Sequence, residues 1–482
     1  MGYNLIKLEL HNKINIHIDT ENTSYLRAVK DHFSLYVEGF RFMPAYNMGG
    51  WDGKVCLFNT SSRTIPYGLL PILIRFTKAE YPEETLTVSS ELANIFKCLP
   101  DPKITNILKY EPRPYQLDCI LTALKYGLGI IKSSVASGKS LIIAYILQEL
   151  FATGKIKNAL IMVPTLNLVS QFFSDLTEYG FSPEKLGKLD GDHHDDISKE
   201  ILISTWQSVG SLLKKSNNII KDRDCIITDE VHIAQARTLQ KILSHSTNAV
   251  VRLGFTGTLP VSKLDMWQIQ SYIGPILKEY TSSDLAKLGY VSKCTINMIN
   301  VKYRERYKGE YNDIKDGVFR NDFRLNLIKN IIKNLDGNVL ILIGKIEKEG
   351  ELLKQYLQNS DVNKEVVFIW GNTKTDERDH WRLELEKRKN IALIASYPIF
   401  SMGVNIPSLK YILFASPVKS NIRVLQSVGR ALRVHTDKTD GAKIFDIVDQ
   451  VKYLNDHGRK RIKYYIREQF EIVEEDVVES YS

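Results

Sequence analysis

The stretch GIIKSSVASGKSLIIAYILQEL (Gly129–Leu150) joins two apolar runs through a loop of small residues. The first run ends near Lys132 and the second begins after Ser140. A strand that leads through such a loop into a helix directs backbone N–H groups and a helix N-terminus toward one point. Phosphate groups bind at such a point, so the stretch predicts a nucleotide-binding loop within an α/β domain.

The residues SGKS (Ser137–Ser140) supply the side chains that this chemistry needs. The Lys139 ammonium would neutralise the β and γ phosphates, and the Ser140 hydroxyl would bind Mg²⁺. The pattern G-x-x-x-x-G-K-[ST] begins with glycine, where this chain has Ser133. A chance SGKS in an ordinary strand–helix turn is the alternative.

A second apolar strand, CIIT (Cys225–Thr228), ends in the acids Asp229 and Glu230. Beside a phosphate loop, the first carboxylate can help to bind Mg²⁺ and the second can polarise the attacking water. Two acids at a strand end are common by themselves. Together with the loop they predict ATP hydrolysis, with ATP and Mg²⁺ as the cofactors.

Arginines in QSVGRALR provide a third candidate element. Arg430 and Arg433 are three residues apart, and therefore on one face of a helix, with Gln426 nearby. An arginine that reaches the γ-phosphate stabilises the charge of the transition state and couples hydrolysis to domain movement. A solvated basic helix is the alternative.

Apolar runs alternate with amphipathic segments in two series. The first series is 158–163, 201–204, 225–228 and 251–255, and the second is 338–343, 365–370, 391–395, 411–415 and 443–448. The alternation predicts two parallel α/β sheets with helices on both faces and ligands beyond the carboxyl ends of the strands. We expect the connection between them near 280–290, and interpret 302–317 as a charged segment between the two domains.

Eight short motifs lie in a fixed order between residues 113 and 433. They are RPYQ (113–116), SGKS (137–140), VPT (163–165), STWQS (204–208), DEVH (229–232), TGT (256–258), SMGVNIP (401–407) and QSVGRALR (426–433). In this order the chain from about residue 110 to residue 435 resembles the superfamily-2 helicases. The resemblance implies two RecA-like motor domains.

The resemblance also implies a role for individual positions. The residues that would bind the nucleotide are Arg113, Gln116 (which would read adenine), Ser137, Gly138, Lys139, Ser140 and Gly403. Those that would hold nucleic acid are Pro164, Thr165, Thr205, Gln207 and Ser396. Those that would couple hydrolysis to movement are His232, Thr256, Gly257 and Thr258. Asn405 stands where the family has an acid, so no role is assigned to it.

Residues 1–100 precede all these motifs and predict a separate α+β domain. They begin with the alternating NLIKLELHNKINIHID (4–19) and continue with a helix candidate, TSYLRAVKDHF (23–33). Ten Lys and Arg balance ten Asp and Glu in this segment, so it is not an unspecific basic arm. The predicted domains are 1–100, 101–283 and 284–482.

The stretch FRFMPAYNMGGWDGKVCLF (40–58) is rich in aromatic and basic residues. Aromatic residues around Gly-Gly and Asp-Gly turns are typical of a hairpin with its own small core. Followed by RTIPYGLLPILIRF (63–76), the stretch resembles the N-terminal module of phage branch-migration helicases, which assists binding to branched DNA. The resemblance makes Arg41, Trp51, Lys54 and Arg63 candidate DNA contacts. Trp51 could equally belong to the core of the hairpin.

The resemblance predicts an ATP-dependent DNA helicase that unwinds and branch-migrates forks, Holliday junctions and R-loops in phage replication, recombination and repair. An RNA helicase and a double-strand translocase subunit of a restriction system are the enzyme alternatives. A nucleotide-gated clamp without turnover is the alternative from another class.

Bulk properties fit these expectations. The net charge of +8 and the pI of about 8.9 favour an anionic partner. Five cysteines are scattered singly, which argues against a zinc site or a disulfide framework. No apolar run reaches membrane-spanning length and no signal-peptide pattern precedes the first domain. We expect a soluble monomer in the cytoplasm, the host's if the chain is phage-encoded, with no membrane contact and unknown protein partners.

Overall fold

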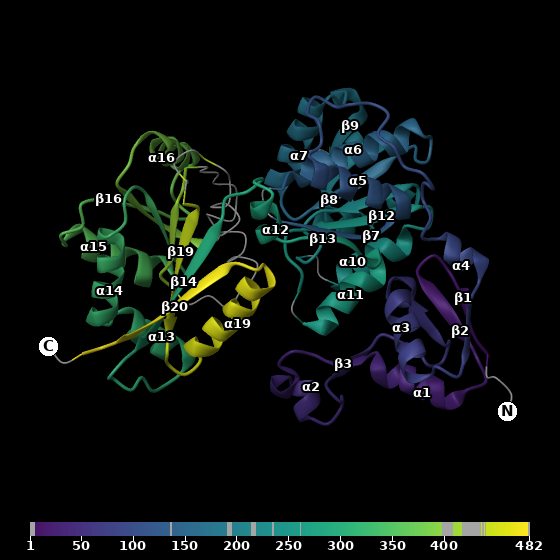
Figure 1. Cartoon of the computed structure of the whole chain (residues 1–482), viewed down its shortest axis with the longest axis horizontal. Coiled ribbons are helices and arrows are strands. Elements are labelled where there is room, and N and C mark those ends of the chain that lie inside the picture. Colours follow the sequence, from purple (N-terminus) through teal and green to yellow (C-terminus); the bar gives the residue numbers. More distant parts are fainter. Residues whose placement is uncertain are drawn as a thin grey trace. The chain divides into compact units, whose positions relative to one another are not determined.

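The computed structural model describes residues 5–134, 137–189, 195–213, 218–233, 236–260, 262–397, 408–416, 435, 438 and 440–480. The chain divides into two compact units (Figure 1). The first consists of Met1–Ser133 and Gly138–Glu279, and the second of Ser134–Ser137 and Tyr280–Ser482. The predicted three-domain division at residues 100 and 283 stays a prediction.

The N-terminal module (residues 5–100) is built on a four-stranded sheet in the order β5-β2-β1-β6. The strands of the module are β1 (Leu5–Leu10), β2 (Asn15–Asp19), β3 (Ser34–Tyr36), β4 (Lys54–Cys56), β5 (Thr64–Pro66) and β6 (Thr85–Val88). Of these, β3 and β4 form a separate two-stranded sheet. The helices of the module are α1 (Thr23–His32), η1 (Phe40–Phe42), α2 (Pro44–Asn47), η2 (Tyr67–Leu69), α3 (Leu70–Glu80) and α4 (Ser90–Asn94). Alternate residues of β1 and β2 are buried, as the sequence alternation predicts.

The first motor domain contains a seven-stranded sheet in the order β13-β7-β12-β11-β8-β10-β9. Its strands are β7 (Leu128–Ser133), β8 (Ala159–Val163), β9 (Leu186–Leu189), β10 (Ile201–Thr205), β11 (Cys225–Thr228), β12 (Val251–Thr256) and β13 (Ile276–Tyr280). Its helices are α5 (Pro114–Tyr126), α6 (Lys139–Ala152), α7 (Leu166–Tyr179), η3 (Pro183–Lys185), η4 (Asp195–Ser198), α8 (Trp206–Leu212), α9 (Asn218–Lys221), α10 (Ala236–His245) and α11 (Lys263–Ile273). Figure 1 shows α5, α6 and α7 on one side of this sheet and α10 and α11 on the other. The strands from β7 across to β9 in this order pair in parallel, so the predicted parallel sheet is confirmed.

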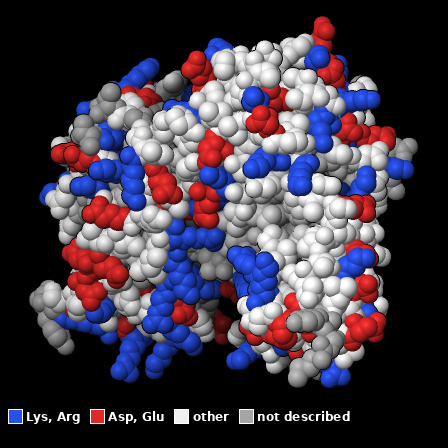
Figure 2. All heavy atoms as spheres, turned by 45° about the vertical axis from the view of Figure 1, so that its right-hand side comes forward, with Lys and Arg blue, Asp and Glu red and all other residues white. Residues whose placement is uncertain are grey.

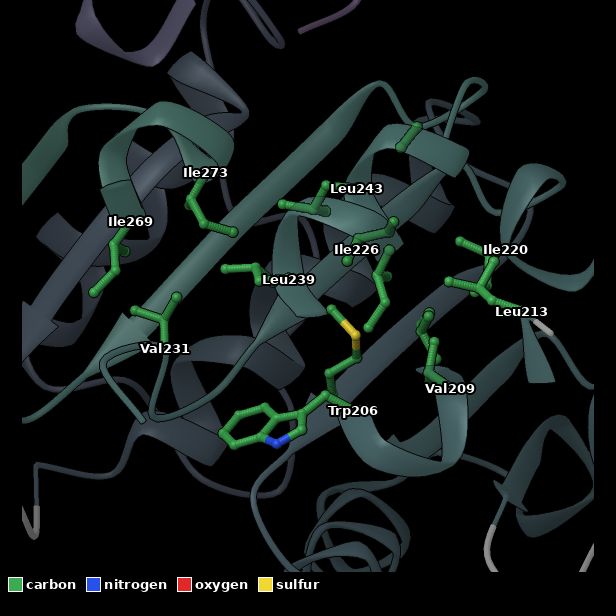
Figure 3. Close-up of a cluster of buried hydrophobic side chains, with 14 of the residues drawn as sticks. Trp206, Val209, Leu213, Ile220, Ile226, Val231, Leu239, Leu243, Ile269 and Ile273 are labelled. Carbon is green, nitrogen blue, oxygen red and sulfur yellow. The ribbon is translucent and has the colours of Figure 1, made fainter. Parts of the chain in front are cut away.

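A continuous apolar cluster fills the space between this sheet and helices α8, α10 and α11 (Figure 3). The residues labelled there are Trp206, Val209, Leu213, Ile220, Ile226, Val231, Leu239, Leu243, Ile269 and Ile273. Trp206 is only 5% exposed, so the predicted motif STWQS contributes to the core as well as to the surface.

The second unit contains a seven-stranded parallel sheet in the order β16-β17-β15-β18-β19-β14-β20. Its strands are β14 (Cys294–Lys302), β15 (Val339–Ile343), β16 (Glu365–Ile369), β17 (Ile391–Ser396), β18 (Tyr411–Phe414), β19 (Ala442–Asp449) and β20 (Glu471–Val478). Its helices are α12 (Ser282–Lys287), α13 (Tyr311–Phe319), α14 (Asp322–Lys333), η5 (Ile346–Gly350), α15 (Glu351–Gln358), α16 (Thr375–Lys387) and α19 (Leu454–Arg467).

Two interpretations of polar segments in this unit are wrong. Residues 302–317 do not connect the two domains, because they follow β14, which already belongs to the second sheet. The acidic segment EIVEEDVV (471–478) has the composition of a solvated acidic tail, but it forms strand β20 and pairs with β14 along its whole length. Its carboxylates tolerate this position because β20 is an edge strand with a largely exposed surface.

Helix α19 carries the basic stretch GRKRIKYYIR, whose sequence is compatible both with packing through Ile462, Tyr465 and Ile466 and with contact to DNA. Tyr465 is buried, but Ile466 is 61% exposed. Arg461 is buried in its place, and its Nε and Nη2 each donate a hydrogen bond of 2.8 Å to the carboxylate of Asp446 on β19. The Tyr465 hydroxyl donates a third hydrogen bond of 2.8 Å to the same carboxylate. A buried ion pair therefore fixes α19 on the sheet.

Helix α11 joins the N-terminal module to the first motor domain. Trp267 is 7% exposed and belongs to the apolar cluster of the module, with its ring centroid 5.1 Å from that of Phe33. Gly68 lies against the backbone of Gln270, since a Cβ at Gly68 would be 1.8 Å from the carbonyl oxygen. The module and the first motor domain thus share one core.

We expect Gly68→Ala to destabilise the first unit. The added methyl group meets backbone, which cannot rotate away, and overpacking of this kind costs roughly 1–3 kcal/mol. Thermal unfolding should show a lower Tm, and limited proteolysis should release the module. Gly50→Ala is the matched control, because its nearest neighbour would be 3.7 Å away, an ordinary contact. Equal Tm values for the two variants would contradict docking on α11.

No helix among the described residues is long and apolar enough to cross a membrane.

Candidate nucleotide and nucleic-acid site

The predicted site residues of the first motor domain gather at one edge of its sheet. Strands β7, β12, β11, β8 and β10 are neighbours and run parallel, so the loops after them meet at their carboxyl ends. These loops carry SGKS after β7, TGT at the end of β12, DEVH after β11, VPT after β8 and STWQS at the end of β10. Parallel topology therefore brings five separated motifs together.

The SGKS loop enters helix α6 as the sequence predicts. Gly138 caps the helix with φ 73°, a left-handed conformation that favours glycine. A Cβ at Gly138 would lie 2.5 Å from Nε2 of Gln116, so the amide of Gln116 lies against the loop. Oε1 of Gln116 accepts a hydrogen bond of 2.8 Å from the backbone N–H of Arg113 and caps α5. Arg113 itself is exposed.

Lys139, Glu230 and His232 form a cluster at this edge. Nζ of Lys139 is 3.6 Å from Oε1 of Glu230, and Nδ1 of His232 is 3.3 Å from Oε2. Glu230 has φ 47°, a conformation uncommon for a residue with a side chain. Strained residues of this kind are often found at functional sites. The ion pair places an acid next to the lysine that would bind phosphate.

The two neighbouring acids differ in their pKa values. Burial raises the pKa of Asp229 to about 7, and the charge of Glu230 adds to this shift. Burial acts to raise the pKa of Glu230, but the Lys139 ammonium, His232 and the backbone N–H of Gly257 together outweigh it and lower the pKa. Burial lowers the pKa of His232 to about 4. At neutral pH Glu230 is therefore ionised and can accept a proton, while His232 is neutral.

His232 connects this cluster to the TGT motif. Its Nδ1 forms a hydrogen bond with Oγ1 of Thr256, and the Thr256 hydroxyl in turn donates to the carbonyl of Thr258. The backbone N–H of Thr258 donates back to Oγ1 of Thr256 over 3.1 Å. Since the Thr256 proton is already used, Nδ1 of His232 is the donor to Thr256. Gly257 is buried between the two threonines.

Two predicted nucleic-acid contacts are exposed and two are not. Thr165 caps α7 and is exposed, and Gln207 is exposed beside the buried Trp206. Pro164 is half-buried. Thr205 is 5% exposed, and its Oγ1 accepts a hydrogen bond of 3.2 Å from the backbone N–H of Ser208. The cap formed by Thr205 therefore holds the turn that presents Gln207.

The second unit contributes one described candidate. Ser396 ends β17 and is 3% exposed, so its hydroxyl is not at the surface in this conformation. The other predicted residues of this unit, Gly403, Gln426, Arg430 and Arg433, lie outside the described residues, as does Asn405. Their roles stay predictions.

The aromatic-basic loop (residues 37–53) connects β3 to β4, which pair antiparallel. The predicted hairpin exists, but η1 and α2 occupy its connection in place of a tight Gly-Gly turn. The Phe40 ring stacks on Tyr36 at 4.6 Å and meets Tyr46 edge-on at 4.8 Å. Gly53, with φ 81°, makes room for Phe40, since a Cβ there would be 2.3 Å from its ring. The loop thus has a small aromatic core.

The candidate DNA contacts in this loop and in the residues after it differ in exposure. Arg41 is exposed, and Nζ of Lys54 lies 4.9 Å from the centroid of the Tyr36 ring. Trp51 is half-buried and donates from Nε1 to the carbonyl of Lys54 over 2.7 Å. Arg63 is half-buried, and its Nη1 donates to the carbonyl of Thr20 over 3.1 Å. Trp51 and Arg63 therefore have structural partners within the module.

Sequence reasoning gave no role to the most exposed apolar side chains of this loop. Phe42 is 88% exposed and Met48 is 84% exposed. Both belong to the aromatic-rich stretch of residues 40–58. The only sequence signal was the density of aromatic residues, which does not tell an exposed ring from a buried one.

Three family models match this chain. Residues 109–261 match the model described as "Type III restriction enzyme, res subunit", and residues 324–435 match "Helicase conserved C-terminal domain". Together with the two parallel seven-stranded sheets, these matches decide the assignment. The chain is a superfamily-2 helicase. Residues 5–82 of this helicase match a third model, "DNA helicase UvsW, N-terminal".

Known proteins resemble this helicase over most of its length. It is 28% identical to the ATP-dependent DNA helicase uvsW of Enterobacteria phage T4, over 97% of this chain and 98% of that protein. The crystal structure of T4 UvsW aligns with a TM-score of 0.52 and 25% identity, over 98% of this chain and 99% of that chain. A fragment of a type I restriction HsdR subunit from Vibrio vulnificus YJ016 shares the fold, with a TM-score of 0.59 and 18% identity, over 84% of this chain and 73% of that chain.

Proposed function

We propose that this helicase uses ATP and Mg²⁺ to unwind and branch-migrate branched DNA, including forks, Holliday junctions and R-loops. The observation that carries the proposal is the ion pair between Lys139 and Glu230 at the carboxyl edge of the first motor sheet. The resemblance to an ATP-dependent DNA helicase over 97% of this chain supports DNA as the substrate. A role in phage replication, recombination and repair belongs to the same proposal.

The environment of Asp229 supports Mg²⁺ as the metal. Asp229 is 5% exposed, and its Oδ1 has no hydrogen-bond partner among the described residues. A buried carboxylate without a partner is costly, and a divalent cation would satisfy it. Asp229 and Ser140 would hold Mg²⁺, which would supply neutralisation of phosphate charge. Glu230, ionised beside Lys139, would orient the attacking water and accept its proton.

The aromatic-basic loop supports recognition of a branch point. Arg41 in the loop and Lys54 at the start of β4 carry charges suited to phosphates, and Phe42 projects an aromatic ring from the loop. An exposed ring can stack on a base that has lost its pair, as at a fork or junction. Figure 2 shows clusters of Lys and Arg at the surface, with Asp and Glu beside them, and the net charge of +8 fits an anionic partner.

An unwinding assay on forked, four-way, R-loop and blunt duplex substrates tests the proposal. We expect ATP-dependent unwinding of the branched substrates, with weak activity on blunt duplex. ATPase stimulation by RNA alone would favour an RNA helicase. Translocation along duplex DNA without strand separation would favour a double-strand translocase subunit of a restriction system; the first family model is described as a restriction-enzyme subunit.

We expect Phe42→Ala to weaken binding to a four-way junction without changing stability. Stacking on a base contributes roughly 1–3 kcal/mol, whereas a side chain that is 88% exposed contributes little to folding. Junction affinity and Tm should be measured on the same protein. Phe58→Ala is the contrasting variant, because Phe58 is 3% exposed and its loss should lower the Tm. Unchanged junction affinity in Phe42→Ala would remove this ring from the proposed contact.

A further inference from the structure

The hydroxyl of Ser140 faces two polar residues of helix α7. Its Oγ lies 3.0 Å from the hydroxyl of Tyr179. Asp175 is four residues earlier on the same helix, and it is near enough to Ser140 for the hydroxyl to oppose the rise that burial causes in the pKa of Asp175. An ionised carboxylate only accepts, so toward Asp175 the Ser140 hydroxyl can act only as a donor, with Tyr179 as the donor to Ser140. A serine oxygen has two lone pairs, and this arrangement uses one of them. The second lone pair remains for a metal ion.

Helix α7 connects these two residues to the candidate nucleic-acid site. Thr165 caps its N-terminus, whereas Asp175 and Tyr179 lie in its last two turns. Its 14 residues span about 21 Å. Val169, Phe172 and Leu176 are buried, so the helix is fixed to the domain along its length.

The C-terminal end of α7 has a second anchor. The Tyr110 hydroxyl donates to Oε1 of Glu178 over 2.6 Å, and Nζ of Lys109 lies 3.2 Å from the same oxygen. The Tyr110 and Tyr179 rings meet edge-on at 6.0 Å. The segment that contains Lys109 and Tyr110 leads directly into α5. Its contacts therefore fix the C-terminal end of α7, and with it Tyr179, near Ser140.

We propose that Asp175 and Tyr179 are positioning residues that orient the Ser140 hydroxyl toward Mg²⁺, and that α7 links this metal ligand to the DNA contact at Thr165. The inference rests on the proposed function, because it takes Ser140 as a ligand of Mg²⁺. Residues that orient a metal ligand commonly contribute 10–100-fold to metal affinity.

Fluorescent mant-ADP tests the positioning role without requiring catalysis. Its affinity should be measured with Mg²⁺ and with EDTA for the full-length protein and for Asp175→Ala and Tyr179→Phe. In wild type Mg²⁺ should tighten binding, and we expect Asp175→Ala to reduce this gain about 10-fold or more. Affinity in EDTA should not change. Ser174→Ala, an exposed neighbour on α7, is the matched control.

A double-mutant cycle separates positioning from a structural effect. In a Ser140→Ala background, Asp175→Ala should cause no further loss of the Mg²⁺ gain, because the hydroxyl that it orients is gone. Losses that add in the double variant would overturn the inference. So would a normal Mg²⁺ gain in both single variants. Tyr179→Phe removes a single oxygen, so it tests the inference if Asp175→Ala fails to fold.

The link to DNA is tested in the same assay. Saturating forked DNA should change mant-ADP affinity in wild type with Mg²⁺, and Tyr179→Phe should reduce that change. An unaltered response to DNA in Tyr179→Phe would overturn the link through α7. Failure of the proposed function looks different: wild type would bind no nucleotide, or Lys139→Ala would bind it as well as wild type does.

Discussion

Glu230→Gln should bind ATP and DNA as wild type does, yet hydrolyse ATP 10²–10⁴ times more slowly. Glutamine keeps the volume of the side chain but cannot accept a proton from water. Glu230 is suited to that role because the Lys139 ammonium, 3.6 Å away, together with His232 and the backbone N–H of Gly257, lowers its pKa despite its burial. The amide also removes the negative charge next to Lys139, so nucleotide affinity should be equal or higher. Single-turnover hydrolysis and mant-ATP binding measure the two quantities separately.

Glu200→Gln is the control for this substitution. The control variant makes the same change of charge in the same domain, directly before β10. The side chain of Glu200, however, is 44% exposed and pairs with Lys185 at the surface. We expect wild-type hydrolysis from it, because exposed ion pairs contribute little. Hydrolysis near the wild-type rate in Glu230→Gln would show that another residue activates the water.

Arg461→Ala should destabilise the second unit by about 3–5 kcal/mol. The substitution leaves Asp446, which is 0% exposed, without the two hydrogen bonds that compensate its burial. Arg461→Lys should recover only part of the loss, because an ammonium cannot reproduce the bidentate pair. Hydrogen exchange of peptides from β19 and α19 measures the effect within this unit.

Two further variants show whether the pair or the helix is responsible. Arg459→Ala changes a side chain that is 74% exposed on the same helix, and stability should change by less than about 0.5 kcal/mol. Replacing Arg461 with Met and Asp446 with Leu together should cost less than Arg461→Ala alone, because no unpaired charge stays buried. If the double variant is the less stable one, the hydrogen-bond geometry rather than the unpaired charge dominates.

The sequence predicted the two parallel sheets and the loops after their strands, because both signals are local. Apolar runs such as 225–228 and 391–395 correspond to β11 and β17 within a residue or so. The meeting of Lys139 with Glu230 also followed, since parallel strands bring their carboxyl ends to one edge. Strand β20 was missed because its acids conceal the alternation of an edge strand.

Contacts between distant segments could not be predicted in the same way. Arg461 looks like a solvated residue of a basic helix, and only the position of Asp446 across the fold explains its burial. The shared core of Trp267 and the N-terminal module likewise depends on the path of the chain. The three-domain boundaries, Gln426, Arg430 and Arg433 stay predictions, with the last three outside the described residues.

The position of β14 has a consequence for the order in which the protein folds during synthesis. β14 pairs with β19 on one side and β20 on the other, and both strands follow it by more than a hundred residues. At about 5–20 residues per second, a ribosome needs on the order of 10 s to supply them. Nearly all of the first unit has emerged before β14 does, so it can fold first. During that interval β14 is an apolar strand without partners, which makes the nascent second unit a natural substrate for chaperones.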